Sequence, residues 1–337
     1  MNATLRPGDL TLVTGGSGFL GSAVVRALIE RGVRVRALVR ATSPRENFRG
    51  LDCEVVVGDL TDANSLKAAL KGVRYLFHVA ADYRLWARDP SEIIRANVEG
   101  TLNLKREALA AGVERIVYTS SVAALRVAGA TAPVDETATL SADEAIGAYK
   151  RSKTMAERAV EKMILRDGLP AIIVSPTTPI GPRDIRPTPT GRILLDAARG
   201  RIPAFVDTGL NFVHVDDVAA GHLLAFEKGR IGERYILGGE NLTLQQLLVT
   251  IAELAGRKAP RLKLPRAPLM PFAFAAERIA HLTGKEPLLT LDGLRMSRHH
   301  MFFTSAKAER ELGYRSRPYR EGVADALTWF RTAGYMT

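Results

Sequence analysis

Hydrophobic residues in the first half of the chain follow two alternating patterns. Short runs rich in branched apolar residues are typical of buried strands, and longer stretches between them have the apolar spacing of helices. The strands are predicted at residues 10–14, 34–39, 54–57, 74–79, 115–119 and 171–175, and the principal helices at 18–30, 91–111 and 148–166. Alternating strands and helices indicate βαβ units, so we predict an α/β fold with a doubly wound parallel Rossmann sheet.

The pattern changes at residue 176, where five prolines fall within fourteen residues. Proline cannot continue a helix or a central strand, so we expect a domain boundary here. We assign residues 1–175 and 208–232 to the Rossmann domain, and residues 176–207 and 233–337 to a smaller C-terminal α/β domain. In the second half, Thr243 with Gln246 predicts a capping box that opens a helix, and Gly313 predicts a helix end.

The first strand leads into a glycine-rich turn, TGGSGFLG at residues 14–21, which opens the first helix. Gly15 permits a tight turn, Gly18 lets the backbone approach a pyrophosphate, and Gly21 allows close packing of the helix. The helix N-terminus attracts the phosphates of a dinucleotide. We therefore predict a dinucleotide site here, with Phe19 and Leu20 at the helix start as further contacts.

The end of the second strand distinguishes between the two nicotinamide dinucleotides. A carboxylate there would bind the ribose 2′-hydroxyl of NAD and repel the 2′-phosphate of NADP. The strand instead ends at Arg40, and no acid follows until Glu46. Because a guanidinium can bind a phosphate with two hydrogen bonds, NADP is favoured over NAD, with Arg36 or Arg45 as candidate helpers of Arg40.

A candidate catalytic group combines Tyr149, Lys153 and Ser121. Tyr149 and Lys153 are four residues apart in a predicted helix and therefore project from one face. Ser121 follows the fifth strand, at the carboxyl edge of the sheet where this fold binds its ligands. We expect Tyr149 to act as the acid/base, with its pKa lowered by the Lys153 ammonium, and Ser121 to bind the reacting oxygen of the substrate.

These motifs together resemble the extended short-chain dehydrogenase/reductase superfamily over nearly the whole chain. The resemblance implies that Asp59 and Leu60 approach the adenine, and that Asn97 supports the site. It also places further residues at the cofactor, in addition to the glycine turn and Arg40: Val79, Ala80, Ala81, Tyr149, Lys153 and Pro176.

Two longer segments narrow the resemblance within this superfamily. Residues 176–182 and 211–217 resemble dihydroflavonol 4-reductase-like proteins, whereas residues 149–153 and 181–191 resemble the hopanoid-associated sugar epimerase family. Nucleotide-sugar enzymes usually carry a Tyr-Gly pair shortly after the catalytic serine, where this chain has Ala124 and Leu125. They also carry an Asn before a second Tyr-Gly-Pro, where Thr178 and Ile180 stand here.

Composition and charge limit the other classes of function. The chain has 337 residues and a net charge of +11, but its basic residues form no run with interleaved aromatics, so we expect no nucleic-acid partner. It lacks an apolar stretch of transmembrane length and an N-terminal leader pattern, so we expect a cytoplasmic protein. A homodimer and peripheral membrane contact are both compatible with the sequence.

Cysteine and histidine give no sign of a metal site. Cys53 is the only cysteine, and it precedes a predicted strand as a small, partly buried residue. His78 and His214 lie in apolar strands and are interpreted as structural, while His299 and His300 have no acidic partners at ligand spacing. We therefore predict no metal.

Three functions remain for the whole chain. The first is an NADP-dependent reductase that transfers hydride at a carbinol or carbonyl carbon, and the second is a nucleotide-sugar epimerase or dehydratase with retained NAD. A protein that only senses dinucleotide is the third, but it would not need the Ser, Tyr and Lys group. The apolar segment 264–279, preceded by Arg261, Lys263 and Arg266, is either a core helix or the wall of a pocket for an apolar, polycyclic substrate.

Overall fold

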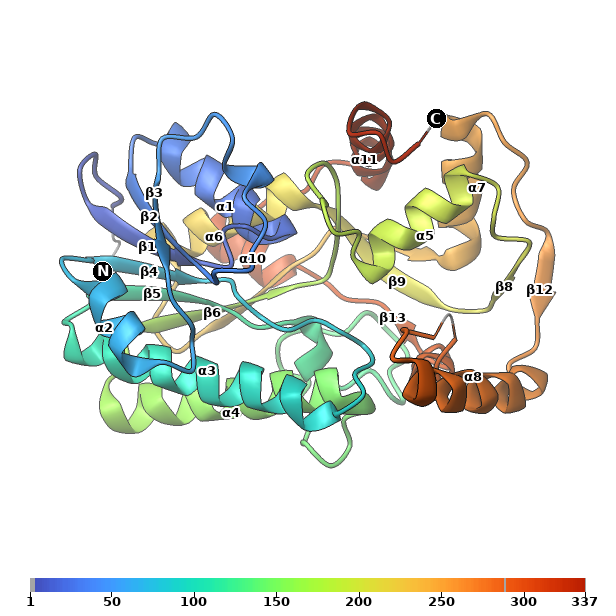
Figure 1. Ribbon diagram of the computed structural model, residues 1–337, viewed down its shortest axis with the longest axis horizontal. Helices are drawn as coiled ribbons and strands as arrows, with labels where there is room; N and C mark the ends of the chain where they lie inside the picture. The colour runs from blue at the N-terminus through green and yellow to red at the C-terminus, as the bar shows by residue number, and fades with distance from the viewer. Residues whose placement is uncertain (1–3, 288, 337) are drawn as a thin grey trace.

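The computed structural model describes residues 4–287 and 289–336. Within them the main element is a parallel sheet of seven strands in the order β10-β6-β5-β4-β1-β2-β3 (Figure 1). The strands are β1 (Leu10–Thr14), β2 (Arg34–Val39), β3 (Glu54–Val57), β4 (Tyr75–His78), β5 (Arg115–Thr119), β6 (Ala171–Pro176) and β10 (Arg234–Leu237). The strand order changes direction between β1 and β4. The predicted doubly wound Rossmann sheet is thus confirmed, and sheets of this kind bind their ligands at such a switch point.

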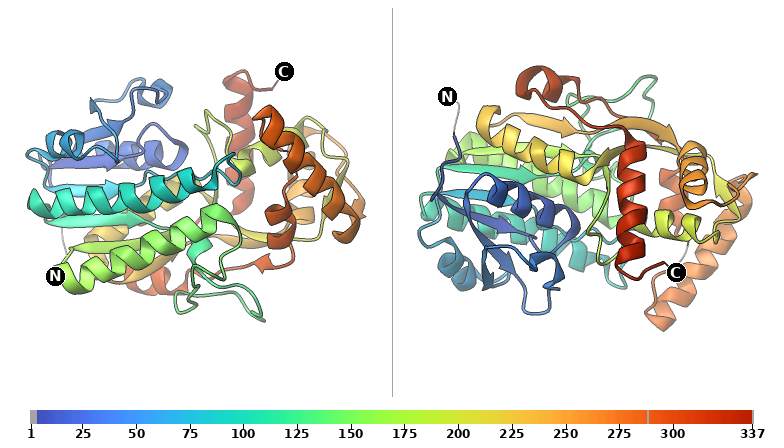
Figure 2. Two further views of the ribbon diagram at one scale, coloured as in Figure 1. Left: turned by 60° about the horizontal axis from the view of Figure 1, so that its bottom comes forward. Right: turned by 90° about the horizontal axis from the view of Figure 1, so that it is seen from above.

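Helices cover both faces of the sheet (Figures 1 and 2). One face carries α1 (Phe19–Glu30), α6 (Val215–Lys228) and α10 (Ala306–Leu312), and the other carries α2 (Ala63–Leu70), α3 (Pro90–Ala110) and α4 (Gly147–Asp167). Each layer has its own apolar core, because strands that are covered on both sides direct alternate side chains to opposite faces. The predicted helices are present, with ends that differ by at most one residue.

A smaller domain stands beyond the carboxyl edge of the sheet (Figure 1). Its strand β9 (Gly209–His214) pairs with β7 (Thr178–Ile180), β11 (Glu240–Thr243) and β13 (His300–Met301), while β8 (Ala204–Val206) pairs with β12 (Leu262–Leu264). A third apolar core joins this sheet to α5 (Pro189–Ala198), α7 (Leu244–Ala255) and α11 (Tyr319–Thr332). Two further helices, α8 (Met270–Thr283) and α9 (Leu291–Met296), lie outside that core, and the short 3-10 helices are η1 (Glu46–Phe48), η2 (Val122–Ala124) and η3 (Ala267–Leu269).

The expected division of the chain into domains differs from the structure at β9 and at β10. Residues 208–232 were assigned to the Rossmann domain, yet β9 lies in the sheet of the smaller domain. Residues 233–337 were assigned to the smaller domain, yet β10 pairs with β6 and forms the edge of the main sheet, and α10 packs against α6 in the core of the Rossmann layer. The partner strands lie more than fifty residues apart in the chain, and no local pattern reports such a pairing.

The predicted helix start at Thr243 and the predicted helix end at Gly313 are confirmed. The Thr243 hydroxyl accepts a hydrogen bond from the Gln246 backbone N–H, and the Gln246 side chain accepts one from the Thr243 N–H, at 3.2 and 2.9 Å. Helix α10 ends at Gly313, whose φ is +72°. In the described part of the chain, no helix is both long enough and apolar enough to cross a membrane.

Candidate active site

The glycine turn between β1 and α1 is shaped by close backbone approaches. Gly15 has φ +72°, and a Cβ there would lie 2.8 Å from the Ala80 Cα at the end of β4. A Cβ on Gly21 would lie 2.0 Å from the Gly15 carbonyl oxygen, so α1 starts directly against the turn. Gly18 is the N-cap residue, and its N–H donates to the Gly15 carbonyl at 2.9 Å. The turn leaves the α1 N-terminus available to a pyrophosphate, as the fingerprint requires.

A buried asparagine that was not predicted holds this turn. The Asn47 amide donates to the carbonyl oxygens of Ser17 at 3.2 Å and of Arg183 at 3.2 Å. Arg183 belongs to the segment after β7 and is the one described non-glycine residue with positive φ, at +75°. Its guanidinium pairs with Asp216 at the start of α6. Asn47 therefore ties the dinucleotide turn to the smaller domain.

Arg40 stands exposed directly after β2. Its positive charge contributes to the lowered pKa of Asp59, so the two side chains share one neighbourhood. Arg36 is not available as a helper, because its guanidinium pairs with Glu54 at 2.9 Å and donates to the Ala69 and Lys71 carbonyls at 2.8 Å. Arg45 is exposed nearby in sequence and remains the other candidate.

The segment after β3 carries Asp59 and Leu60. The Asp59 carboxylate accepts hydrogen bonds from the backbone N–H and the hydroxyl of Thr61, at 2.8 and 2.7 Å, and these bonds hold its pKa below the usual value. A Cβ on Gly100 of α3 would lie 2.9 Å from the Leu60 Cβ. Leu60 is thus fixed against α3, beside the carboxyl ends of β1 and β2.

Residues 79–81 leave β4 beside the glycine turn. The Ala80 N–H donates to the Thr14 hydroxyl at 3.2 Å, which fixes Val79, Ala80 and Ala81 against the end of β1. The preceding His78 is buried, and its Nδ1 lies 2.8 Å from the Lys105 Nζ. Burial, with the nearby lysine charge, keeps the pKa of His78 well below its usual value. This buried contact supports a structural role for His78.

Asn97 links three elements around the candidate catalytic helix. Its side-chain oxygen accepts from the Asp82 N–H at 2.7 Å, and its amide donates to the Asp82 carbonyl and to the Ser152 hydroxyl, both at 2.8 Å. Ser152 in turn donates to the Tyr149 carbonyl at 2.8 Å. Asn97 therefore positions the first turns of α4 relative to the segment after β4.

Tyr149, Lys153 and Ser121 come together at the carboxyl edge of β5. Lys153 is buried in α4, and its ammonium donates to the Thr119 carbonyl at 2.9 Å, directly before Ser120 and Ser121. Burial lowers the pKa of Lys153 to about 8. The Ser121 hydroxyl caps η2 by accepting from the Ala123 N–H at 3.1 Å, and it lies close enough to the Tyr149 side chain to affect the pKa of that phenol.

The pKa of Tyr149 moves in the direction opposite to the expected one. Burial raises it above the usual value, and the hydrogen bond with Ser121 offsets part of that rise. Removal of a phenolate from water is costly, and the Lys153 ammonium is directed at the Thr119 carbonyl. Tyr149 is therefore a protonated phenol in this state.

A buried ion pair behind the candidate catalytic residues was also missed. Glu157 lies four residues after Lys153 on the same face of α4 and pairs with Arg234 of β10 at 2.6 Å. Its negative charge acts against the lowering of the Lys153 pKa. The spacing of Tyr149, Lys153 and Glu157 places all three on one face of a helix and was visible in the sequence. Arg234, the partner of Glu157, was assigned to the other domain, so the ion pair was not predicted.

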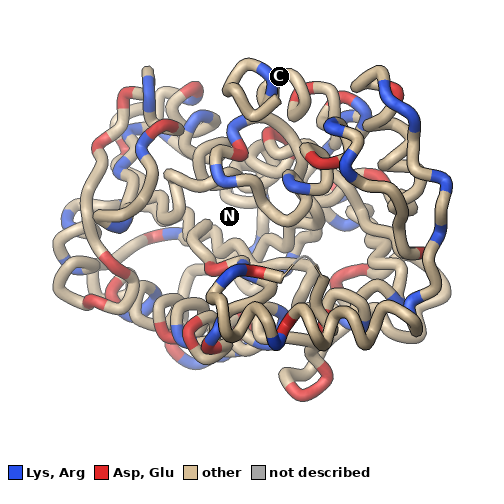
Figure 3. Tube along the Cα trace, turned by 45° about the vertical axis from the view of Figure 1, so that its right-hand side comes forward, with Lys and Arg blue, Asp and Glu red and all other residues tan. Residues whose placement is uncertain are grey.

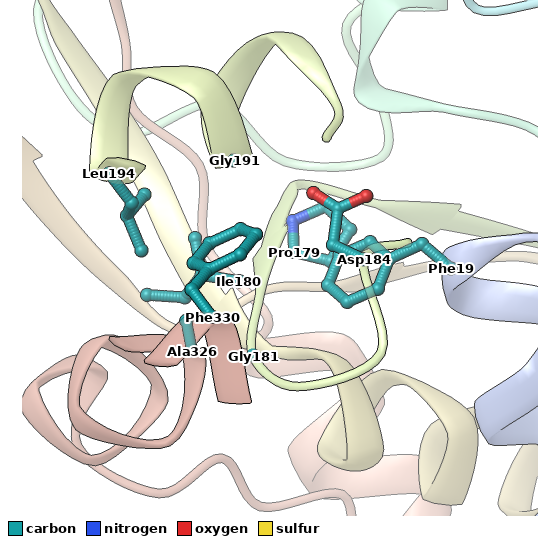
Figure 4. Close-up of a pocket in the computed structure, with 9 residues that line it drawn as sticks. All are labelled: Phe19, Pro179, Ile180, Gly181, Asp184, Gly191, Leu194, Ala326 and Phe330. Carbon is teal, nitrogen blue, oxygen red and sulfur yellow. The ribbon is translucent and has the colours of Figure 1, made fainter. Parts of the chain in front are cut away.

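The segment after β6 closes the site on the side of the smaller domain. Pro176 ends β6, and the Thr177 N–H donates to the Leu237 carbonyl at 3.2 Å. Beyond it, Pro179, Ile180 and Asp184 pack between Phe19 of α1 and Phe330 of α11 (Figure 4). Asp184 is buried and accepts from the Thr188 N–H and hydroxyl at 2.9 Å, and burial raises its pKa to about 6.

Comparison with known proteins agrees with this architecture. Residues 11–238 match the model of the NAD dependent epimerase/dehydratase family. The chain belongs to this family. The family's members use a nicotinamide dinucleotide, so the protein is an NAD(P)-dependent enzyme of the extended short-chain dehydrogenase/reductase type, an oxidoreductase or an epimerase.

Three relatives of this family member cover almost its whole length. A Synechocystis protein named "Putative dihydroflavonol 4-reductase" is 44% identical over 100% of this chain and 98% of its own. Sterol demethylase protein B of Methylococcus capsulatus is 39% identical over 96% and 99%. A 4-hydroxy-2-methyl-3-oxo-4-farnesyl-3,4-dihydroquinoline-1-oxide ketoreductase of Stigmatella aurantiaca is 33% identical over 96% and 97%. The solved structure of gox2253 superposes with a TM-score of 0.89, at 55% identity over 98% of this chain and 100% of that one.

Proposed function

We propose that this family member is an NADP-dependent reductase that transfers hydride to a carbonyl carbon of an apolar, polycyclic or isoprenoid substrate. The observation that carries the proposal is the meeting of Tyr149, Ser121 and Lys153 at the carboxyl edge of β5, two strands from the glycine turn. A bound nicotinamide supplies the hydride at this edge. The chain's own residues supply the proton and the orientation of the substrate.

The residues at the turn fit a dinucleotide. The glycine positions exclude any Cβ between β1, β4 and α1, which keeps backbone N–H groups accessible to a pyrophosphate. Asp59 and Leu60 would border the adenine, and residues 79–81 with Pro176 would line the nicotinamide half. Arg40 would bind the 2′-phosphate. Because the strand end carries this guanidinium and no carboxylate, NADP is favoured over NAD.

Tyr149 is suited to donate a proton to a carbonyl oxygen. Its raised pKa keeps the phenol protonated, and hydride addition to a carbonyl creates an alkoxide that needs that proton. Ser121 would donate a hydrogen bond to the same oxygen. Lys153, with a pKa of about 8, carries positive charge near neutral pH and would stabilise the tyrosinate left behind.

The place where nucleotide-sugar enzymes carry Tyr-Gly is apolar here. Leu125 is buried in a cluster with Val134, Ile236 and Phe303, and Ala124 is fully buried beside it. These residues offer no polar side chain to a nucleotide diphosphate. The names of two relatives, a sterol demethylase protein and a ketoreductase of a farnesylated quinoline, support an apolar substrate in the same family.

The resident dinucleotide distinguishes the proposed reductase from an epimerase. The purified protein is denatured and the released dinucleotide is identified, and a second sample is titrated with NADPH. An empty site that binds NADPH supports the reductase, because a reductase must exchange its cofactor at every turnover. Stoichiometric, non-exchanging NAD would instead support an epimerase, which returns the hydride to its own substrate.

A further inference from the structure

Helix α8 exposes its apolar side chains to solvent. Within it, Ala273 and Ala280 are the buried residues, whereas the exposed fraction is 70% for Phe272 and 82% for Leu282. The expected core helix is therefore wrong for this segment, and these side chains do not wall a closed pocket either. A surface helix normally turns its apolar stripe toward the core, whereas α8 turns its apolar side chains toward solvent.

The exposed apolar residues form one stripe. Phe272, Ala275, Ile279 and Leu282 follow each other at intervals of three and four residues and therefore share one face of the helix. Phe274 lies beside the stripe, and the Arg278 guanidinium lies 5.0 Å from its ring centroid. We call this surface the α8 face.

Basic residues flank the α8 face. Residues 257–286 contain seven Lys or Arg and two acids, Glu277 and Glu286, so this segment has an excess of positive charge. Glu277 is partly buried and accepts a hydrogen bond from the Leu291 N–H at 2.8 Å. The exposed bases include Arg261 before α8, Arg278 within it and Lys285 after it. Figure 3 shows how Lys and Arg, and Asp and Glu, are distributed along the trace of the whole molecule.

The α8 face lies near the rim of the candidate active site. Figures 1 and 2 show α8 at the outer edge of the smaller domain. At its C-terminal end the His281 ring meets the Trp86 ring with centroids 5.5 Å apart. Trp86 belongs to the segment after β4 that begins with residues 79–81. In the same segment Tyr83 and Leu85 are also exposed.

We infer that the α8 face docks on an anionic lipid bilayer. Aromatic and aliphatic side chains insert at the headgroup boundary, and flanking Lys and Arg are attracted to anionic headgroups. The positive charge around the face matches such a surface and would repel the same face of a second, identical chain. The inference does not depend on which hydride-transfer reaction the site performs.

Vesicle flotation tests the inference with the full chain. The protein is mixed with vesicles of phosphatidylcholine alone, or of phosphatidylcholine and phosphatidylglycerol in equal amounts. We expect flotation with the anionic vesicles, which decreases as salt is added. Absence of flotation with anionic vesicles would overturn the inference.

Matched variants locate the contact. Phe272→Ser combined with Leu282→Ser should weaken vesicle binding by about tenfold or more, because the inserted apolar area is lost. Leu165→Ser, at an exposed leucine in the last turn of α4, should leave it unchanged. Unaltered melting temperature and dinucleotide binding show that the variants are folded. Equal vesicle binding by parent and double variant, or a parent dimer that the double variant dissociates, would contradict the inference.

Discussion

The side-chain amide of Asn97 donates a hydrogen bond to the Ser152 hydroxyl at 2.8 Å, and this contact fixes α3 to the first turn of α4. The same asparagine binds both backbone groups of Asp82, so the segment after β4 and the turn carrying Tyr149 move as one unit. Substrate and cofactor must be held together for hydride transfer. Asn97 connects the segment after β4 to the turn carrying Tyr149, the two segments that would hold them.

Removal of the Asn97 side chain should reduce both stability and turnover. Asn97→Ala leaves the Asp82 N–H without its partner in a partly buried place, and one such loss costs about 1–3 kcal/mol. Chemical denaturation should show a decrease in the free energy of unfolding of this size. We expect kcat to fall more than dinucleotide affinity, because Tyr149 loses its placement. A variant with unchanged stability would contradict the role of this contact.

Tyr149→Phe should abolish turnover and leave dinucleotide binding nearly intact. The phenolic oxygen alone exchanges the proton, and loss of a general acid typically reduces rates by roughly two to four orders of magnitude. Steady-state kinetics and dinucleotide titration measure the two effects separately. Full activity in this variant would exclude Tyr149 from the chemistry.

Arg40→Asp should weaken NADPH binding much more than NADH binding. The substitution replaces a phosphate-binding guanidinium with a carboxylate that repels the phosphate, and we expect a change of roughly tenfold to a hundredfold in the ratio of the two dissociation constants. Arg34→Asp, at the exposed opposite end of β2, is the matched control. Equal affinity of the parent for both dinucleotides would refute the assignment.

Activity should decrease as the pH rises above about 8. The pKa of Lys153 is lowered to about 8 by burial, so its ammonium is present below that pH and is lost above it. The measurement is the pH dependence of kcat/KM. In Lys153→Arg the charge persists, and any remaining activity should lose this alkaline decline. Lys162→Arg, at an exposed position of the same helix, should retain the parental profile.

Asp184→Asn should stabilise the protein above pH 6. The folded pKa of Asp184 is about 6, above its usual value of 3.8, so the folded state binds the proton more tightly than the unfolded state does. The contribution of Asp184 to the free energy of unfolding therefore falls as the pH rises from about 4 to 6, by up to about 3 kcal/mol. Denaturation of both proteins across this range should show a difference that grows with pH. Asp196→Asn controls for the general loss of a carboxylate.

Local signals were sufficient to predict much of the fold. The glycine turn, the Tyr149 and Lys153 spacing and the Thr243 capping box each depend on residues a few positions apart, and the structure shows each as expected. Periodicity also located six of the seven strands of the main sheet, because a strand covered on both faces needs a continuous apolar run.

Contacts between distant segments could not be predicted in the same way. Three such contacts depend on which segments meet in space. They are the pairing of β10 with β6, the hydrogen bond from Asn47 to the Arg183 carbonyl, and the ion pair of Arg36 with Glu54. The apolar stripe of α8 was visible in the sequence, but periodicity does not tell which side faces water. The raised pKa of Tyr149 likewise follows from burial, which a motif does not report.

The most direct test of the proposed reductase follows the hydride itself. NADPH carrying deuterium at the transferred position is incubated with the enzyme and a panel of polycyclic and isoprenoid ketones, with UDP-sugars as the alternative substrates. We predict that a ketone is reduced with one NADPH oxidised per alcohol, and that the deuterium appears on the new carbinol carbon. Conversion of a UDP-sugar to its epimer, with no NADPH consumed and no deuterium in the product, would contradict it.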